Sequence, residues 1–104
     1  GTLYIITDEN TNSPVINPIT TVTANYTVTD EDSTILTNGS TDLNISLPSA
    51  AANSNYVYNI KNISTNSITI SAAAGNIDGQ ASRIISQQFE NVTVQSDGSN
   101  WFII

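Results

Sequence analysis

The chain has 104 residues and a mass of 11.1 kDa, enough for a single domain. Two Lys and Arg residues stand against nine Asp and Glu, so the formal net charge is −7 and a cationic surface for nucleic acid or an anionic membrane is excluded. The absence of His and Cys excludes Ser-His-Asp and Cys-His catalysis and zinc sites built from thiolates or imidazoles. We therefore expect a chain that is not an enzyme and that uses no cofactor.

The composition is polar but almost uncharged. Asn, Thr and Ser make up 41 of the 104 residues, whereas charged residues make up 11%. Disordered chains share this polarity but have few β-branched and aromatic residues, and this chain has 15 Ile, 4 Tyr, 2 Phe and 1 Trp. The sequence therefore predicts a folded domain with a modest core. Because no disulfide is available, association between copies is the simplest further source of apolar burial.

The first 20 residues differ in pattern from the rest. Residues 2–7 have the composition of a strand, and residues 8–18 are rich in turn-forming residues and contain Pro14 and Pro18. The first residues do not have the pattern of a signal peptide, and no apolar run is long enough to insert into a membrane. We interpret residues 1–20 as a connector and residues 21–104 as a β-domain.

From about residue 20 onward, apolar and polar residues alternate with a period of two, which is typical of half-buried β-strands. The clearest example is Leu43–Leu47. A longer strand is predicted over Tyr56–Ile63, with its two Tyr side chains and Ile60 on one face. The same alternation predicts strands at residues 26–29, 34–37, 68–71, 92–96 and 100–104, and less regularly at 83–86.

Turn signals separate these strands. Asn38-Gly39, Asp78-Gly79 and Asp97-Gly98 are pairs that favour positive φ, and the last pair predicts a hairpin between residues 92–96 and 100–104. Residues 48–55 and 71–75 are loops of small residues, each of which can hold one helical turn. About seven to nine short strands with this punctuation predict an all-β fold, an antiparallel β-sandwich or a jelly-roll-like domain.

Two acidic segments are candidate cation sites. Asp30 and Asp32 place oxygens at alternate positions, as calcium loops do, but the remaining ligands of such a loop are missing. We interpret the segment Asp30-Glu31-Asp32 as a solvated turn between strands, and Asp8-Glu9 as part of the connector. The sequence therefore gives no metal site.

Glu90 is a candidate for glycosidase chemistry, which needs two carboxylates about 5–10 Å apart on either side of a sugar. An Asp from a loop would have to supply the second carboxylate, and nothing in the sequence selects it. We therefore assign no catalytic residue.

Asn and aromatic residues offer two further readings. Five Asn-X-Ser/Thr triplets begin at Asn25, Asn38, Asn44, Asn62 and Asn91, but this composition yields about four by chance, so they do not indicate glycosylation. Trp101 could stack on a sugar, yet its strand also carries Phe102, Ile103 and Ile104. We place Trp101 in the core or at a subunit interface, whereas Tyr4 is less constrained and can be exposed.

An ordered series of segments resembles the C-terminal or near-terminal β-domains of bacteriophage fibre proteins, both tail fibres and head fibres. The segments are VTANYTVTDEDSTIL at 22–36, ISLPSA at 45–50, YVYNIKNIS at 56–64, NSITISAAAGNIDGQ at 66–80 and VTVQSDGSNWFII at 92–104. The final segment, with Ser96-Asp97-Gly98-Ser99-Asn100-Trp101, is the most specific of them.

The resemblance implies a structural fibre module of a virion, displayed as a homotrimer and involved in attachment to a host-surface glycan or protein. It implies a place on the virion, extracellular once released. The family has no single motif for receptor contacts, so no receptor-binding residue is assigned here. A bacterial surface adhesin or a carbohydrate-binding module is the alternative. In either case, the many hydroxyl and amide groups and the scarcity of cations favour a neutral, hydroxyl-rich ligand.

Overall fold

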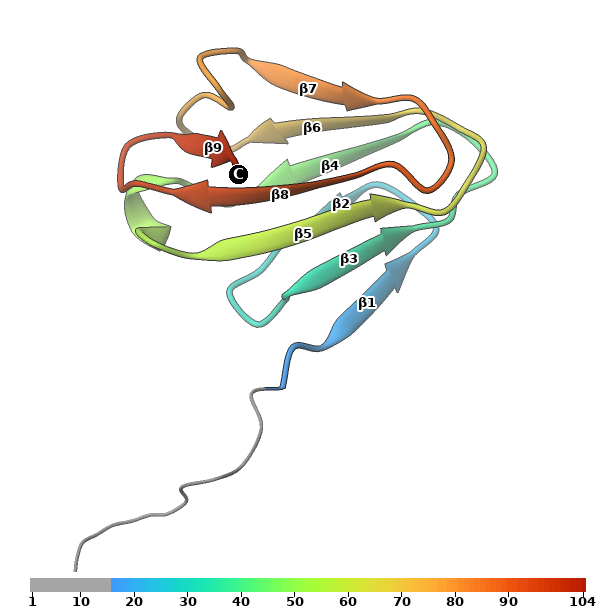
Figure 1. Cartoon of the computed structure of the whole chain (residues 1–104), viewed down its shortest axis with the longest axis horizontal. Coiled ribbons are helices and arrows are strands. Elements are labelled where there is room, and N and C mark those ends of the chain that lie inside the picture. Colours follow the sequence, from blue (N-terminus) through green and yellow to red (C-terminus); the bar gives the residue numbers. More distant parts are fainter. Residues whose placement is uncertain (1–15) are drawn as a thin grey trace, which may run out of the picture.

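Residues 16–104 are described by a computed structural model, in which two β-sheets pack face to face (Figure 1). Sheet A has the strand order β1-β3-β5-β8-β9, and sheet B has the order β2-β4-β6-β7. The strands of sheet A are β1 (Ile19–Val22), β3 (Thr34–Thr37), β5 (Val57–Asn62), β8 (Asn91–Ser96) and β9 (Trp101–Ile103). The strands of sheet B are β2 (Tyr26–Thr27), β4 (Leu43–Leu47), β6 (Ile68–Ala72) and β7 (Ser82–Ile85). A 3-10 turn, η1 (Ala51–Asn53), lies before β5.

The first six strands alternate between the two sheets. Their neighbouring pairs are all parallel: β1 with β3, β3 with β5, β2 with β4, and β4 with β6. The chain therefore winds through three coils, and each coil contributes one strand to each sheet, as in a short solenoid. After the third coil the pattern changes, because β7, β8 and β9 pair antiparallel with their neighbours. We call the six parallel strands the coil stack.

The all-β two-sheet sandwich is confirmed, but the prediction that it is antiparallel is wrong, because both sheets are mixed. Alternation with a period of two reports which face of a strand is buried, and it is the same for either strand direction. In an antiparallel hairpin, the chain turns back and pairs with the strand that it has just completed. In the coil stack, by contrast, each short connection leads from one sheet into the other. Successive strands of one sheet therefore run in the same direction (Figure 1).

The predicted strands from residue 26 onward are all present, and η1 lies within the loop that was expected to hold a helical turn. β1 was not predicted as a separate strand, because it crosses the proposed boundary between connector and domain. Residues 1–15, with the predicted strand at 2–7, the pair Asp8-Glu9 and Tyr4, lie outside the described residues. No helix in residues 16–104 is long and apolar enough to cross a membrane.

The turn predictions have different outcomes. The hairpin at Asp97-Gly98 is confirmed: Ser96 pairs with Trp101, and Gly98 has a φ of 94°. Gly79 also has a positive φ, as predicted. The prediction for Gly39 is wrong, since its φ is not positive. A glycine is needed there for space, because an added Cβ would lie 3.0 Å from Leu43 Cδ1.

Alternate side chains of both sheets fill the space between them. Ile35, Ile45, Ile60, Ile70 and Trp101 are fully buried in this core. The Trp101 ring lies 5.6 Å from the Tyr58 ring at a tilted angle of 47°, and its Nε1 donates to Pro48 O at 3.0 Å. The prediction placed Trp101 in the core or at a subunit interface, and the structure places it in the core. Burial raises the pKa of Tyr58 to about 12, so this phenol is neutral at physiological pH.

Candidate functional site

The end of the coil stack formed by β1 and β2 has strand edges that nothing else in the described chain pairs with. Thr34 N donates to Pro18 O, and Asn38 N donates to Val22 O. Within residues 18–22, the even-numbered residues therefore point their backbone N–H and C=O groups toward β3. In a parallel ladder the intervening residues, Ile19 and Thr21, point theirs away from it. We call β1 and β2 the open end of the stack.

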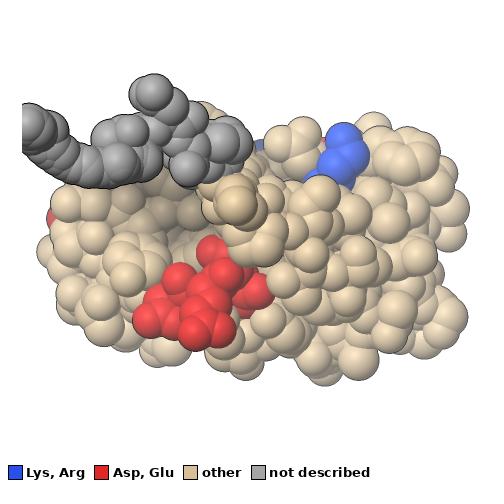
Figure 2. Space-filling model, turned by 90° about the horizontal axis from the view of Figure 1, so that it is seen from below, with Lys and Arg blue, Asp and Glu red and all other residues tan. Residues whose placement is uncertain are grey.

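The predicted turn Asp30-Glu31-Asp32 connects β2 to β3 at this open end. Figure 2 shows a patch of acidic side chains on the face of the molecule that it displays. Asp32 accepts hydrogen bonds from the Thr20 hydroxyl at 2.9 Å, the Tyr26 hydroxyl at 2.8 Å and Thr29 N at 2.8 Å. Burial opposes ionisation of Asp32, but these hydrogen bonds outweigh it and hold its pKa below the ordinary value. Asp32 therefore ties both edge strands to the turn, which is a structural role.

Other acidic groups do not converge on a common point. In residues 16–104 no three acidic side chains come together as they would around a metal ion. Glu90 Oε1 accepts a hydrogen bond from Gln87 N at 3.2 Å, which closes the turn before β8. The carboxylate considered for glycosidase chemistry thus has a local structural partner.

Asn62, one of the five Asn-X-Ser/Thr positions, is fully buried and organises the loops at one end of the strands. Its amide donates to Asn66 O at 2.7 Å, and its Oδ1 accepts from the hydroxyls of Ser64 at 2.8 Å and Thr37 at 3.2 Å. Its backbone O accepts from Phe89 N at 2.5 Å. Asn62 is therefore a hub of buried hydrogen bonds, and a glycan could not be attached there without breaking them.

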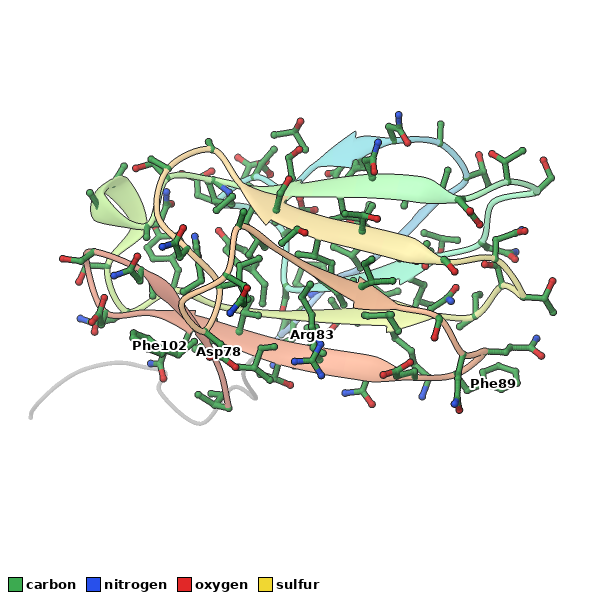
Figure 3. All side chains as sticks on the ribbon, turned by 90° about the horizontal axis from the view of Figure 1, so that it is seen from above. Asp78, Arg83, Phe89 and Phe102 are labelled. Atoms are coloured by element: carbon green, nitrogen blue, oxygen red, sulfur yellow. The ribbon has the colours of Figure 1, made fainter. Side chains whose placement is uncertain are left out.

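Phe89 extends outward from that loop end, with 59% of its surface exposed. Its φ of 67° is unusual for a bulky residue. Figure 3 shows Phe89 and Phe102 at opposite ends of the molecule. The chain therefore has two exposed Phe rings that lie far apart, so the effect of removing one ring can be compared with the effect of removing the other.

The other end of the coil stack is covered by β7, β8 and β9, and we call these three strands the closed end. The loop at residues 76–78 runs along the outer side of β9: Trp101 N donates to Asn76 O at 2.8 Å, and Asp78 N donates to Trp101 O at 3.0 Å. Asp78 Oδ1 also accepts from Ile103 N at 3.0 Å. The edge of sheet A is thereby paired. In sheet B, the edge strand β7 carries the exposed Arg83 (Figure 3).

A groove of about 330 Å³ lies at the closed end, on the outer face of sheet A where β8 turns into β9. The groove is lined by Asn55, Gln95, Ser96, Asp97, Phe102 and Ile104. Phe102 and Ile104 are 42% and 68% exposed and form the apolar part of the lining. Phe102 pairs with Gln95 in the ladder, so a ring and an amide lie side by side on adjacent strands.

Three polar side chains in this groove have capacity for hydrogen bonds. Within residues 16–104, the side-chain amides of Asn55 and Gln95, which line the groove, form no hydrogen bond. Asp97 Oδ1 accepts from Asn100 N and Ser99 N, both at 2.9 Å. These backbone donors lower the pKa of Asp97, so its carboxylate is ionised at neutral pH. Asp97 Oδ2 accepts no hydrogen bond from the described chain.

Sequence reasoning did not find the groove. Trp101 shares its strand with Phe102, Ile103 and Ile104, but sequence reasoning did not assign each of these residues to a face. In the single chain Trp101 is buried, and Phe102 and Ile104 lie on the outer face. Alternation along this segment was the available signal, because it separates Trp101 and Ile103 from Phe102 and Ile104. Alternation does not show that Asn55 and Asp97 also line the groove.

No protein-family model matches the chain, and comparisons with curated proteins and with solved structures give no significant match. The function is therefore argued from the fold, the groove and the residues that line it.

Proposed function

We propose that the chain is a structural fibre module of a bacteriophage virion, in a tail fibre or a head fibre, that forms a homotrimer and takes part in attachment to the host surface. The observation that supports this best is the coil stack with one open and one closed end. A stack of parallel coils lengthens along a single axis when coils are added at an open end. Such a stack suits a shaft-like element, and the antiparallel closed end suits its tip.

The proposed trimer is supported by exposed apolar side chains together with the resemblance to fibre domains. Eight large hydrophobic residues of the described chain are exposed, among them Ile16, Ile19 and Ile84. An 11.1 kDa domain with no Cys has few other ways to bury more apolar surface. Association of copies would bury part of it and would couple folding to assembly.

Light scattering on the purified chain at micromolar concentration tests the trimer. We expect a mass three times the 11.1 kDa of one chain, and a melting temperature that rises with protein concentration. A monomer throughout the dilution series would contradict the proposal. Attachment is tested by adsorption of labelled trimer to bacterial cells, which should exceed that of dissociated subunits because three linked sites bind together.

A bacterial surface adhesin or a carbohydrate-binding module is a second candidate, and the groove at Phe102 favours it. A sugar-binding monomer would distinguish it from the fibre module. In that case calorimetry would detect binding of a sugar by a chain whose mass in solution is 11.1 kDa.

A further inference from the structure

We infer that the groove at the closed end is a binding site for a neutral sugar, with the Phe102 ring as its platform. The inference rests on the proposed role in attachment and names the ligand class and the residues for that role. The groove volume of about 330 Å³ lies within the range of small-ligand sites, which begins near about 300 Å³.

The lining of the groove suits both kinds of surface that a sugar presents. The exposed Phe102 ring and the Ile104 side chain offer an apolar area against which the C–H groups of a sugar ring can pack. The amides of Gln95 and Asn55 each offer a donor and an acceptor, and Asp97 Oδ2 offers a charged acceptor. Neighbouring hydroxyls of a sugar also act as both donors and acceptors, so they match this set.

The backbone holds these groups in place. Gln95 and Phe102 lie on paired strands, and Asn55 N donates to Ser96 O at 2.8 Å. Asn55 has a φ of 70°, a left-handed conformation that Asn adopts more readily than most residues. Asp97 is fixed by two hydrogen bonds inside the hairpin turn. A site built on strands and on a closed turn needs little rearrangement to bind.

Charge selects a neutral ligand. Asp97 is the charged residue in the lining, and the whole chain has a formal net charge of −7, so anionic sugars are disfavoured. The groove offers only a few neutral contacts, each of them weak, so one groove should bind with a dissociation constant in the millimolar range. Because little charge is neutralised, affinity should change little between about 50 and 500 mM salt.

The test is a nuclear magnetic resonance titration of the full, isotope-labelled chain. The probes are the methyl glycosides of glucose, galactose, mannose and N-acetylglucosamine, each at millimolar concentration. We expect at least one probe to shift the amide signals of Gln95, Asp97 and Phe102 in a saturable way, while those of β2 remain unchanged. If none of the four shifts these signals, the inference is overturned.

Variants decide whether the ring is the platform. Phe102→Ala should weaken binding of that probe by about tenfold or more, and Phe102→Tyr should retain it. Phe89→Ala is the matched control. It removes an exposed ring from the β7–β8 loop, which lies at the other end of the molecule from Phe102 in Figure 3, and it should leave binding unchanged. Unchanged binding by Phe102→Ala would overturn the inference. Groove signals that shift on dilution of the protein alone would show a second copy in the groove and would also overturn it.

The outcomes separate this inference from the proposed function. If the trimer forms and adsorbs to cells, but Phe102→Ala adsorbs equally well, the groove is not the site and the fibre module stands. If the chain is a monomer that does not adsorb, but a probe shifts the groove signals, the fibre module is wrong and the sugar site stands.

Discussion

The two ends of the stack protect their strand edges by different means. At the closed end, the loop at residues 76–78 pairs with β9, so the edge of sheet A has partners within the chain, whereas β7, the edge strand of sheet B, has no further partner strand in residues 16–104. At the open end, Ile19 and Thr21 point theirs away from the sheet, and an acidic turn held by Asp32 lies beside them. Carboxylates near an edge hinder the approach of another acidic chain. Hydrogen bonds within the chain occupy the backbone groups of an edge at any salt concentration. Repulsion by carboxylates weakens with added salt and as the carboxylates are protonated at low pH.

This difference suits a module with one fixed end and one end that can receive a neighbour. The closed end buries Trp101 and places the groove beside the β8–β9 hairpin. At the open end, the outer edges of β1 and β2 have no partner strand in residues 16–104. Substitutions at the two ends should therefore have very different effects.

The largest difference should come from truncating one buried and one exposed side chain. Trp101→Ala removes a fully buried indole, its hydrogen bond to Pro48 O and its packing on Tyr58, so the free energy of unfolding should fall by about 3–5 kcal/mol. Ile19→Ala at the open end should lower it by less than about 0.5 kcal/mol. Urea unfolding followed by circular dichroism measures both, and equal losses would contradict the comparison.

Two glycines test how closely the closed end is packed. A Cβ at Gly75 would lie 2.7 Å from Ser99 O, and the φ there is +95°; a Cβ at Gly79, with a φ of +77°, would meet no atom within 4 Å. Gly79→Ala should therefore cost about 1–2 kcal/mol for its backbone conformation alone. Gly75→Ala should cost about 2–4 kcal/mol, because the clash adds to it. If the two variants melt at the same temperature, the loop does not pack on the hairpin as described.

Proline substitutions test the open edge directly. In the parallel ladder the Thr20 N–H points at β3, whereas the Thr21 N–H points away from it. Thr20→Pro should cost about 1–3 kcal/mol, since it removes a ladder hydrogen bond and the hydroxyl that donates to Asp32, and Thr21→Pro should cost less than about 1 kcal/mol. Thermal unfolding gives both values. A Thr21→Pro variant as unstable as Thr20→Pro would mean that the edge is paired after all.

The smallest effect concerns pH. The pKa of Asp32 is lower in the folded chain than its ordinary value, so its ionised form stabilises the fold above that ordinary value, about 3.9, and this contribution disappears as pH falls through the lowered pKa. Wild type should therefore melt above Asp32→Asn near pH 6, and the gap should narrow steadily towards pH 2. A gap that stays constant with pH would show that the charge of Asp32 does not stabilise the open end.

The sequence was sufficient to place most strands and their buried faces, because alternation reports burial directly. The hairpin at Gly98 was found from its turn pair, Asp97-Gly98, and the burial of Trp101 from the apolar residues on its strand. The sequence was not sufficient for strand direction, since the alternation within Leu43–Leu47 is the same in a parallel and an antiparallel sheet. The groove was missed for a related reason. Asn55 and Phe102 are far apart in the chain, and only the pairing of β5 with β8 and of β8 with β9 brings them together.

Hydrogen exchange of individual backbone amides tests most directly whether one end of the stack is open and the other closed. The account predicts that the amides of Ile19 and Thr21 exchange at nearly the rate of an unfolded chain. The amides of Asp78 and Trp101, which donate across the loop and β9, should exchange far more slowly. Equal protection of the two pairs would contradict the account.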